Sequence, residues 1–502
     1  MRTVNHFVNG NHWIGNSERF GEVYNPATGS IIAKVRLAST DDVNSVVDLA
    51  LKAQLAWGVT PPAKRATVMF EFRDKLNKNL DELAVLLSQE HGKTVSDAKG
   101  EISRGIEVIE FACGIPHLLK GEYSEQVAAA VDTFSVRQPV GVVGGITPFN
   151  FPAMVPLWMY PISIACGNAF VLKPSEKDPT VVIRIAELFK EAGLPDGVFN
   201  VVNGDKEAVD ALLNNTNISA ISFVGSTKVG EYIYTKGTAS GKRVQALCGA
   251  KNHLVVMPDA DMDQVADALM GSAYGSAGER CMAISVAVPV GEGTANKLIQ
   301  VLEPRIKALK VQAYTDPTSE MGPVISKESL EKILGYISQG EAAGAKLVID
   351  GRGVSPDGHK AGYFLGGCLF DNVKPDMSIY REEIFGPVLS VVRAHSYEDA
   401  VSMINSHEYG NGAAIFTRDG DTARDFCTRV RIGMVGVNVP IPVPVAYYSF
   451  GGWKRSLFGD HHIHGMEGVR FNTRLKTITS RWPSGIKEGA IFNFHSGSDT
   501  KD

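Results

Sequence analysis

One cysteine lies in a loop-like stretch that could present a reactive thiol. Cys281 stands within GSAGERCMAIS, residues 275–285, where glycines and alanines leave little bulk for packing. The cation of Arg280 is expected to favour the thiolate, which is the nucleophilic form of cysteine. On this stretch alone, a small buried cysteine beside a surface arginine is an equal alternative. The pattern indicates a candidate nucleophile for covalent catalysis.

A glycine-bounded loop could hold the phosphate of a cofactor. Residues 225–230, GSTKVG, follow an apolar run and open a helical pattern, so backbone amides and the helix dipole could receive an anion. The spacing departs from the GxGxxG fingerprint, which makes the loop a weak signal by itself. Lys173 ends the run AFVLK and could donate to sugar hydroxyls, while Glu176 could accept from one. A solvated ion pair between these two residues is the alternative.

Composition points to small-molecule partners. The chain has 502 residues, a formal net charge of -5 and 44% hydrophobic residues, which is typical of a globular protein with two or three domains. It lacks a dense Lys/Arg block, which argues against nucleic-acid binding by bulk electrostatics. The longest apolar region, 151–172, is interrupted by prolines and makes a poor membrane span. We expect neither nucleic acid nor a membrane as a partner.

The cysteine pattern predicts a reducing compartment and no metal. Six cysteines are scattered singly, without a CxxC pair or metal-ligand spacing. The tract HHIH, 461–464, follows Phe-Gly-Asp in a predicted surface turn, and we do not interpret it as a metal site. The first residues lack both an apolar signal core and an Arg/Ser-rich leader, so we predict a cytoplasmic location.

The elements that position these residues follow an α/β pattern. From Phe134 onward, strands and helices alternate about every 30 residues, which predicts a parallel sheet with crossover helices. Ligands of such sheets bind outside the carboxyl ends of the strands, where residues 147–150, 173–177 and 225–230 fall. Earlier in the chain we predict a hairpin at Asn9-Gly10, and helices from Thr40, from Pro62 to Gly92 and from a cap at Ser96.

Five motifs resemble those of the NAD(P)-dependent aldehyde dehydrogenase superfamily in order and interval. They are TPFNFP (147–152), VLKPSE (171–176), FVGST (223–227), GERCM (278–282) and EEIFGPVL (382–389), and the resemblance spans about 25–482. ALCGAKNH (246–253), the stretch 438–460 and RLKTITSRWP (474–483) resemble the CoA-acylating semialdehyde dehydrogenases within that superfamily. The resemblance implies an α/β fold with a Rossmann-like cofactor domain, an α/β catalytic domain and a small β oligomerisation element.

The resemblance also implies a role for each matching residue. Cys281 would attack the aldehyde carbon, and the Asn150 side-chain amide would form an oxyanion hole with the Cys281 backbone N–H. Hydride would pass to NAD and leave a thioester on the cysteine. Glu383 and Phe385 match residues that hold the nicotinamide ribose. The other cofactor positions are Thr147, Phe149, Lys173, Glu176, Lys177, Gly225, Ser226, Gly230 and Cys248, the last standing where glycine is usual.

One departure from the wider superfamily concerns deacylation. Members that hydrolyse the thioester carry a glutamate at the start of an E-L-G-G stretch, and the matching stretch here is Ala246-Leu247-Cys248-Gly249, without a carboxylate. Water needs a base, whereas a thiol with a pKa of about 8.5 is already partly ionised at neutral pH. Coenzyme A is therefore the expected acyl acceptor. We expect Ala246→Glu to raise turnover with water.

The resemblance implies a substrate that carries a carboxylate. Arg280 pairs in the family pattern with a helix arginine that aligns with Arg104, and a guanidinium suits a carboxylate. Helical periodicity alone leaves Arg104 solvent-exposed, because it lies roughly 200° around the helix from Ile102. The implied reactions are methylmalonate semialdehyde to propionyl-CoA and malonate semialdehyde to acetyl-CoA. Preference between them, NAD against NADP, and service in valine, β-alanine or inositol breakdown stay open.

The predicted organisation has three parts. Residues 1–120 and 138–250 form the NAD-binding domain, 251–440 the catalytic domain, and 121–137 with 466–484 the oligomerisation element, with Val469 to Thr479 as a strand and 485–502 as a tail. The resemblance implies a homotetramer built from dimers. Two alternatives stay open at this point: a hydrolytic semialdehyde dehydrogenase that releases the free acid, and a non-catalytic protein on the same scaffold.

Overall fold

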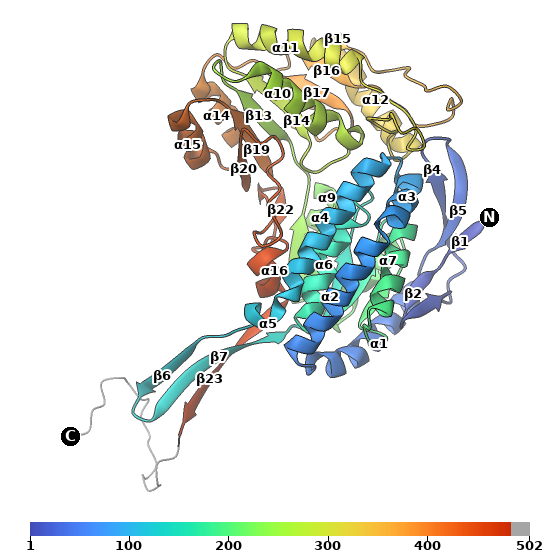
Figure 1. Ribbon diagram of the computed structural model, residues 1–502, viewed down its shortest axis with the longest axis vertical. Helices are drawn as coiled ribbons and strands as arrows, with labels where there is room; N and C mark the ends of the chain where they lie inside the picture. The colour runs from blue at the N-terminus through green and yellow to red at the C-terminus, as the bar shows by residue number, and fades with distance from the viewer. Residues whose placement is uncertain (483–502) are drawn as a thin grey trace.

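Two large sheets dominate the computed structural model, which describes residues 1–482 (Figure 1). The first has eight strands in the order β22-β12-β11-β8-β9-β10-β2-β3. Its five central strands run parallel, and antiparallel strands close both edges, which confirms the predicted parallel sheet. Its strands are β2 (His6–Val8), β3 (Asn11–Trp13), β8 (Val142–Ile146), β9 (Ala169–Lys173), β10 (Phe199–Val201), β11 (Ile218–Val224), β12 (Arg243–Leu247) and β22 (Leu457–Phe458).

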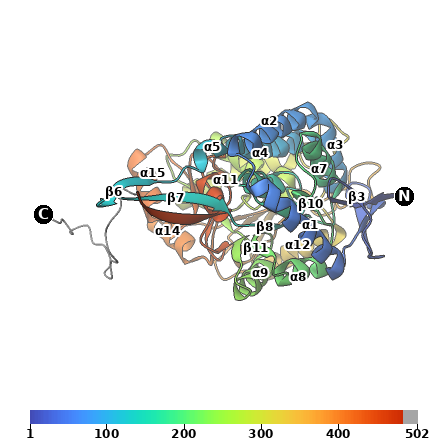
Figure 2. The same cartoon turned by 90° about the horizontal axis from the view of Figure 1, so that it is seen from below.

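Helices cover both faces of this sheet (Figure 2). The buried side chains of its strands alternate between the two faces. In β8, Val142 and Ile146 pack on one face and Val143 on the other. Because both faces are buried, these strands read as continuous apolar runs. One face carries α1 (Thr40–Gly58), α8 (Lys206–Asn214) and α9 (Thr227–Ala239). The other carries α2 (Pro62–Lys78), α3 (Leu80–His91), α4 (Val95–Cys113), α6 (Met154–Ala165) and α7 (Thr180–Glu191).

The second sheet has seven strands in the order β15-β16-β17-β14-β13-β19-β20, all parallel except β15. Its strands are β13 (Asn252–Val256), β14 (Ile284–Pro289), β15 (Lys346–Ile349), β16 (Cys368–Asp371), β17 (Val388–Val391), β19 (Gly412–Phe416) and β20 (Met434–Val437). The helices of this region are α10 (Met262–Leu269), α11 (Glu292–Lys307), α12 (Lys327–Ala342), α13 (Ser378–Arg381), α14 (Tyr397–Ser406) and α15 (Gly420–Arg429).

The N-terminal predictions are partly confirmed. The hairpin turns at Asn9-Gly10, and α1 begins at Thr40, capped by Ser39. The single helix predicted from Pro62 to Gly92 is wrong, because Asn79 leaves helical geometry and separates α2 from α3. The cap of α4 is Thr94, two residues before the predicted Ser96, and its side chain accepts from the Asp97 N–H.

A three-stranded antiparallel sheet projects from the body of the molecule (Figure 1). It consists of β6 (Tyr123–Ala128), β7 (Val131–Pro139) and β23 (Thr473–Arg481). The strand predicted from Val469 is wrong in its first part, because residues up to Phe471 end helix α16 (Gly465–Phe471). The predicted domain boundaries stay a prediction, and the predicted tail, 485–502, lies outside the described residues.

Smaller elements complete the described chain. They are β1 (Arg2–Val4), β4 (Phe20–Asn25), β5 (Ser30–Arg36), α5 (Ile115–Leu118), β18 (Tyr409–Gly410), β21 (Trp453–Lys454) and two short helical segments, η1 (Met270–Tyr274) and η2 (Gly275–Gly278). Among residues 1–482, no helix combines the length and apolar character that a membrane span needs.

Candidate active site

Cys281 lies in the segment that connects helix α10 to strand β14, in agreement with the predicted loop. Three residues just before it have positive φ: Ser276 (53°), Ala277 (53°) and Gly278 (71°). Such a conformation is costly for serine and alanine and persists only where surrounding structure imposes it. This turn precedes Cys281, which lines a cavity together with residues that follow strands of the first large sheet.

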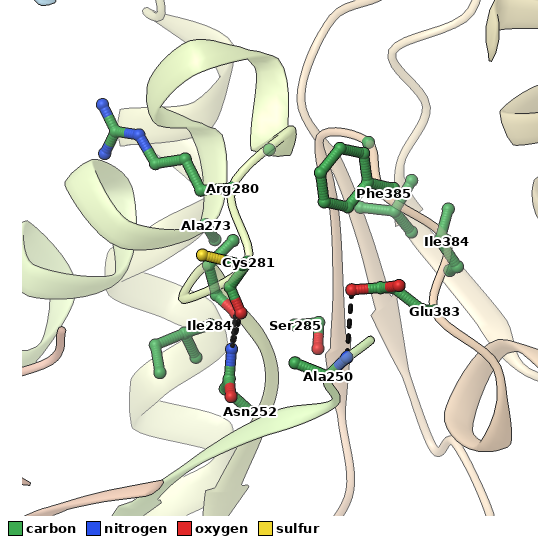
Figure 3. Close-up of a pocket in the computed structure, with 14 residues that line it drawn as sticks. Ala250, Asn252, Ala273, Arg280, Cys281, Ile284, Ser285, Glu383, Ile384 and Phe385 are labelled. Carbon is green, nitrogen blue, oxygen red and sulfur yellow. Dashed lines mark hydrogen bonds between the residues drawn. The ribbon is translucent and has the colours of Figure 1, made fainter. Parts of the chain in front are cut away.

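Two asparagine side chains fix the backbone of the cysteine. Asn252 Nδ2 donates to the Cys281 carbonyl at 2.9 Å and to the Ala283 carbonyl at 2.9 Å (Figure 3). Asn411 Nδ2 donates to the same Cys281 carbonyl at 3.1 Å. Asn252 Oδ1 also accepts from the Gly412 N–H, which begins β19. Sequence reasoning missed both asparagines, because nothing in their local sequence marks a contact 29 or 130 residues away.

The predicted effect of Arg280 on Cys281 is confirmed in direction, but other effects outweigh it. Burial, with a smaller contribution from the Glu383 carboxylate, raises the pKa of the Cys281 thiol to about 12, while the Arg280 cation lowers this pKa with a weaker effect. Arg280 turns away from Glu383 (Figure 3), and its Nη2 pairs with Asp97 Oδ1 at 2.7 Å. The arginine is thus engaged elsewhere, and the thiol stays protonated at neutral pH.

A cavity of about 210 Å³ brings most of the predicted site residues together. Asn150 reaches it from the segment after β8, and Cys281 faces it from the opposite sheet. Glu383 Oε1 accepts from the Ala250 N–H at 3.0 Å, and burial raises the pKa of its carboxyl group. The cavity is lined by Pro148, Phe149, Asn150, Val224, Gly225, Ser226, Cys248, Gly249, Cys281, Ser329, Lys332, Glu383, Ile384 and Phe385.

Two aromatic rings, those of Phe149 and Phe385, line the cavity. Phe149 and Phe385 meet edge to face with their centroids 5.9 Å apart. Phe385 has φ of 61°, an unusual value for a bulky residue. The strained backbone directs the turn after Glu383 toward the segment that carries Phe149 and Asn150.

The five remaining predicted cofactor residues do not line the cavity. Four of them lie at or after the ends of β8 and β9, and the fifth lies in α9: Thr147, Lys173, Glu176, Lys177 and Gly230. Lys173 Nζ pairs with Glu176 Oε2 at 2.9 Å, and the Thr147 N–H donates to the Lys173 carbonyl at 3.2 Å. The Lys177 N–H donates to Ser175 Oγ at 3.1 Å. Gly230, in the first turn of α9, packs against the Cys248 sulfur.

The residues could hold a dinucleotide. Ser226 caps α9 without a side-chain hydrogen bond, so the first amides of this helix are available to a phosphate. A Cβ atom at Gly249 would lie 2.7 Å from Thr227 Oγ1 and 2.9 Å from Glu383 Oε2. The absence of a side chain there keeps the path between the α9 terminus and Glu383 open.

Strand alternation corrects the position at which a general base would stand. Ala246 packs with Ile146 and Ile233 on the α1–α8–α9 face of the first sheet. Leu247 packs on the other face, in the cluster that contains Val224 and Met282 and against which Cys281 lies. Position 246 therefore points away from Cys281, which contradicts the predicted position of the general base. Position 247 is on the correct side, and its leucine carries no acid–base function.

Arg104 belongs to α4, and Arg280 contacts the same helix through Asp97. Asp97, the partner of Arg280, and Arg104 are seven residues apart on this helix, which places them on the same side about 10 Å apart along the axis. Arg104 pairs with Glu107 at 2.6 Å and donates to the Pro444 carbonyl at 3.0 Å. Its side chain is 34% exposed, so it is less free than periodicity alone predicts.

A model of the aldehyde dehydrogenase family matches residues 13–478. The chain is 60% identical to a malonate-semialdehyde dehydrogenase of Pseudomonas aeruginosa, over 99% of this chain and all of that protein. It is 46% identical to the mitochondrial, acylating methylmalonate-semialdehyde dehydrogenase of Arabidopsis thaliana, over 95% of this chain and 79% of that protein.

Solved structures agree with these sequence matches. A candidate methylmalonate-semialdehyde dehydrogenase from Sinorhizobium meliloti, complexed with NAD, superposes with a TM-score of 0.96 and 58% identity, covering 97% of this chain and 99% of that one. The methylmalonate-semialdehyde dehydrogenase of Oceanimonas doudoroffii gives a TM-score of 0.95 and 55% identity, with the same coverage.

Proposed function

This chain belongs to the aldehyde dehydrogenase family, and we propose that it is an NAD-dependent, CoA-acylating semialdehyde dehydrogenase. Its substrates are methylmalonate semialdehyde, which gives propionyl-CoA, and malonate semialdehyde, which gives acetyl-CoA. The observation that carries the proposal is the cavity where Asn150, Cys281 and Glu383 meet, with the apolar Leu247 where a water-activating carboxylate would stand.

The first half of the reaction forms a thioester. The Cys281 thiol, whose pKa is raised, gives up its proton to solvent, and its sulfur attacks the aldehyde carbon. The Asn150 side-chain amide and the Cys281 N–H stabilise the oxyanion, and loss of one such donor typically costs about 10²- to 10³-fold in rate. The α9 terminus, Lys173, Glu176 and Glu383 would hold NAD, which would accept the hydride that leaves the former aldehyde carbon as the oxyanion collapses to the thioester.

The second half removes carbon dioxide and transfers the acyl group. Arg280 and Arg104 exchange their carboxylate partners, Asp97 and Glu107, for the substrate carboxylate until the thioester has formed. Breaking the bond to that carboxylate leaves its electron pair on the thioester as an enolate, whose oxygen the same two donors stabilise; protonation at carbon then gives the saturated acyl group. The CoA thiolate attacks the thioester carbon and displaces the Cys281 sulfur, because a thiol ionises without the base that water requires.

Assembly and location are part of the same proposal. Tyr123 and Leu475 of the β6-β7-β23 sheet, and Trp482 just after β23, are more than half exposed, which supports a role of this sheet in joining subunits into a homotetramer built from dimers. All six cysteines are unpaired, which supports a reducing location such as the cytoplasm.

The test is the dependence of turnover on the acyl acceptor. Purified protein is assayed with each semialdehyde and NAD, with and without CoA, and products are identified by mass spectrometry. We expect NADH and acyl-CoA in equal amounts, and without CoA a single burst of NADH that stops at one equivalent per site. Sustained turnover to free acid without CoA would favour the hydrolytic alternative, and NAD binding without any burst would favour a non-catalytic protein.

A further inference from the structure

A buried ion pair holds the chain segment that carries Asn150. The side chains of Lys93 and Glu101 are both 0% exposed, and Lys93 Nζ lies 2.7 Å from Glu101 Oε2. The same Nζ donates to the Asn150 carbonyl at 2.8 Å. Lys93 lies between helices α3 and α4, and Glu101 lies on α4, so Lys93 contacts the residue expected to bind the oxyanion and Glu101 holds Lys93.

The glutamate holds the other end of that segment. Glu101 Oε1 accepts from the N–H groups of Ala153 at 2.9 Å and Met154 at 3.1 Å. These donors stand at the start of α6, where backbone N–H groups have no intrahelical partner. Lys93 Nζ also lies 4.3 Å from the centroid of the Phe151 ring. The pair therefore contacts residues 150, 151, 153 and 154 through charge-assisted bonds and one cation–π contact.

Stability alone does not explain such a pair. Removing two charges from water costs several kcal/mol per ion, and apolar residues of similar volume often stabilise a protein as well or better. What an apolar pair could not provide is a fixed position for the Asn150 carbonyl and the α6 amides together. Oxyanion stabilisation depends on donors that are already in place before charge develops.

We infer that Lys93 and Glu101 are positioning residues that fix the Asn150 amide where the oxyanion develops. This inference rests on the role of Asn150 in the proposed function. Neither residue lines the cavity, and each acts through the backbone of residues 150–154.

A double-mutant cycle separates positioning from general support of the fold. Lys93→Met, Asn150→Ala and the double variant are compared by the NADH burst rate with the best wild-type aldehyde. We expect the burst to fall about 10- to 100-fold in Lys93→Met and about 10²- to 10³-fold in Asn150→Ala. In the Asn150→Ala background, adding Lys93→Met should change the rate by less than about threefold, because the group that it positions is gone. An equal fall in both backgrounds would overturn the inference.

Two further measurements test whether Lys93→Met disturbs the whole site instead of the position of Asn150 alone. Alkylation of Cys281 by iodoacetamide needs no oxyanion donor, so Lys93→Met should leave its rate constant within about twofold of wild type. The dissociation constant of NAD should be equally unaffected, and a parallel loss of either would contradict positioning. The matched control is Lys242→Met, because Lys242 is also buried and donates to two carbonyls, those of Asn215 after α8 and of Ile218 at the start of β11. This control should lower stability and leave the burst unchanged.

A milder variant covers the case in which Lys93→Met does not fold. Glu101→Gln keeps the volume and an acceptor for the Ala153 and Met154 amides while removing the charge that orients Lys93. Its burst should fall about tenfold in the wild-type background and not in Asn150→Ala. Loss of CoA dependence in the wild type would contradict the proposed function without affecting either cycle, so the two failures are distinguishable.

Discussion

Gly230 and Cys248 touch so closely that a Cβ atom at position 230 would overlap the Cys248 sulfur. The contact joins the first turn of α9 to the residue after β12, both beside the cavity. Cys248 thus supports the cofactor loop from beneath, and a smaller residue at 248 would leave space there.

Gly230→Ala should weaken NAD binding about tenfold, because the added methyl must displace either α9 or the Cys248 side chain. Cys248→Gly should restore binding in the double variant by making room for that methyl. Fluorescence titration with NAD measures both effects. Gly100→Ala is the control, since a Cβ atom there meets nothing within 4 Å. If Cys248→Gly gives no rescue, the contact does not determine the position of the loop.

Leu247→Glu should divert part of the thioester to free acid in the absence of CoA, because it places a carboxylate on the face of the sheet that Cys281 approaches. Ala246→Glu is the matched comparison. It buries an unpaired carboxylate on the opposite face, so it should lower thermal stability without raising acid formation. Product analysis after the first turnover decides between them; more acid from the 246 variant than from the 247 variant would refute the assignment of faces.

The sequence predicted the parallel sheet, the hairpin and the strand-end positions of the cofactor residues, because each depends on local pattern. It misplaced the general-base position by one residue, and in a strand one residue reverses the face. Asn252, Asn411 and Lys93 were missed because their importance comes from partners distant in the chain. The ionisation of Cys281 was misjudged because desolvation outweighs a neighbouring charge when that charge is paired elsewhere.

Alkylation of Cys281 in the free protein should accelerate by about tenfold per pH unit between about pH 7 and pH 9, without levelling near the ordinary thiol value. The reason is the raised pKa of this thiol, about 12, which leaves the thiolate a small fraction throughout that range. Stopped-flow measurement with iodoacetamide reports the profile. A plateau near pH 8.5 would show that burial is not the controlling factor.

Glu383→Gln should increase the alkylation rate of the free protein at pH 8, since removing the nearby negative charge lowers the pKa of the Cys281 thiol. The same change should slow turnover with NAD, because Glu383 is a proposed contact of the cofactor. Glu382→Gln is the control, as its side chain is exposed and pairs with Tyr336 instead. Equal alkylation in the two variants would contradict the electrostatic explanation.

Arg104→Met should raise the KM for malonate semialdehyde about 10- to 100-fold through loss of a charge-assisted contact. The KM for propionaldehyde, which has no carboxylate, should stay within about threefold of wild type. Steady-state assays with both aldehydes provide the comparison. Arg305→Met serves as control, because that arginine forms surface pairs with Asp263 and Asp267. A similar rise for both aldehydes would argue against carboxylate recognition by Arg104.

The Asn252 side chain connects β13 to the Cys281 and Ala283 carbonyls before β14 and to the first residue of β19. Three neighbouring strands therefore share one anchor, and the nucleophile has no freedom to travel independently of them. When NADH leaves and CoA binds, we expect the turn that bears Glu383 and Phe385 to move, and the segment that bears Cys281 to stay in place. We therefore expect the Cys281 sulfur to keep one position while NADH is replaced by CoA.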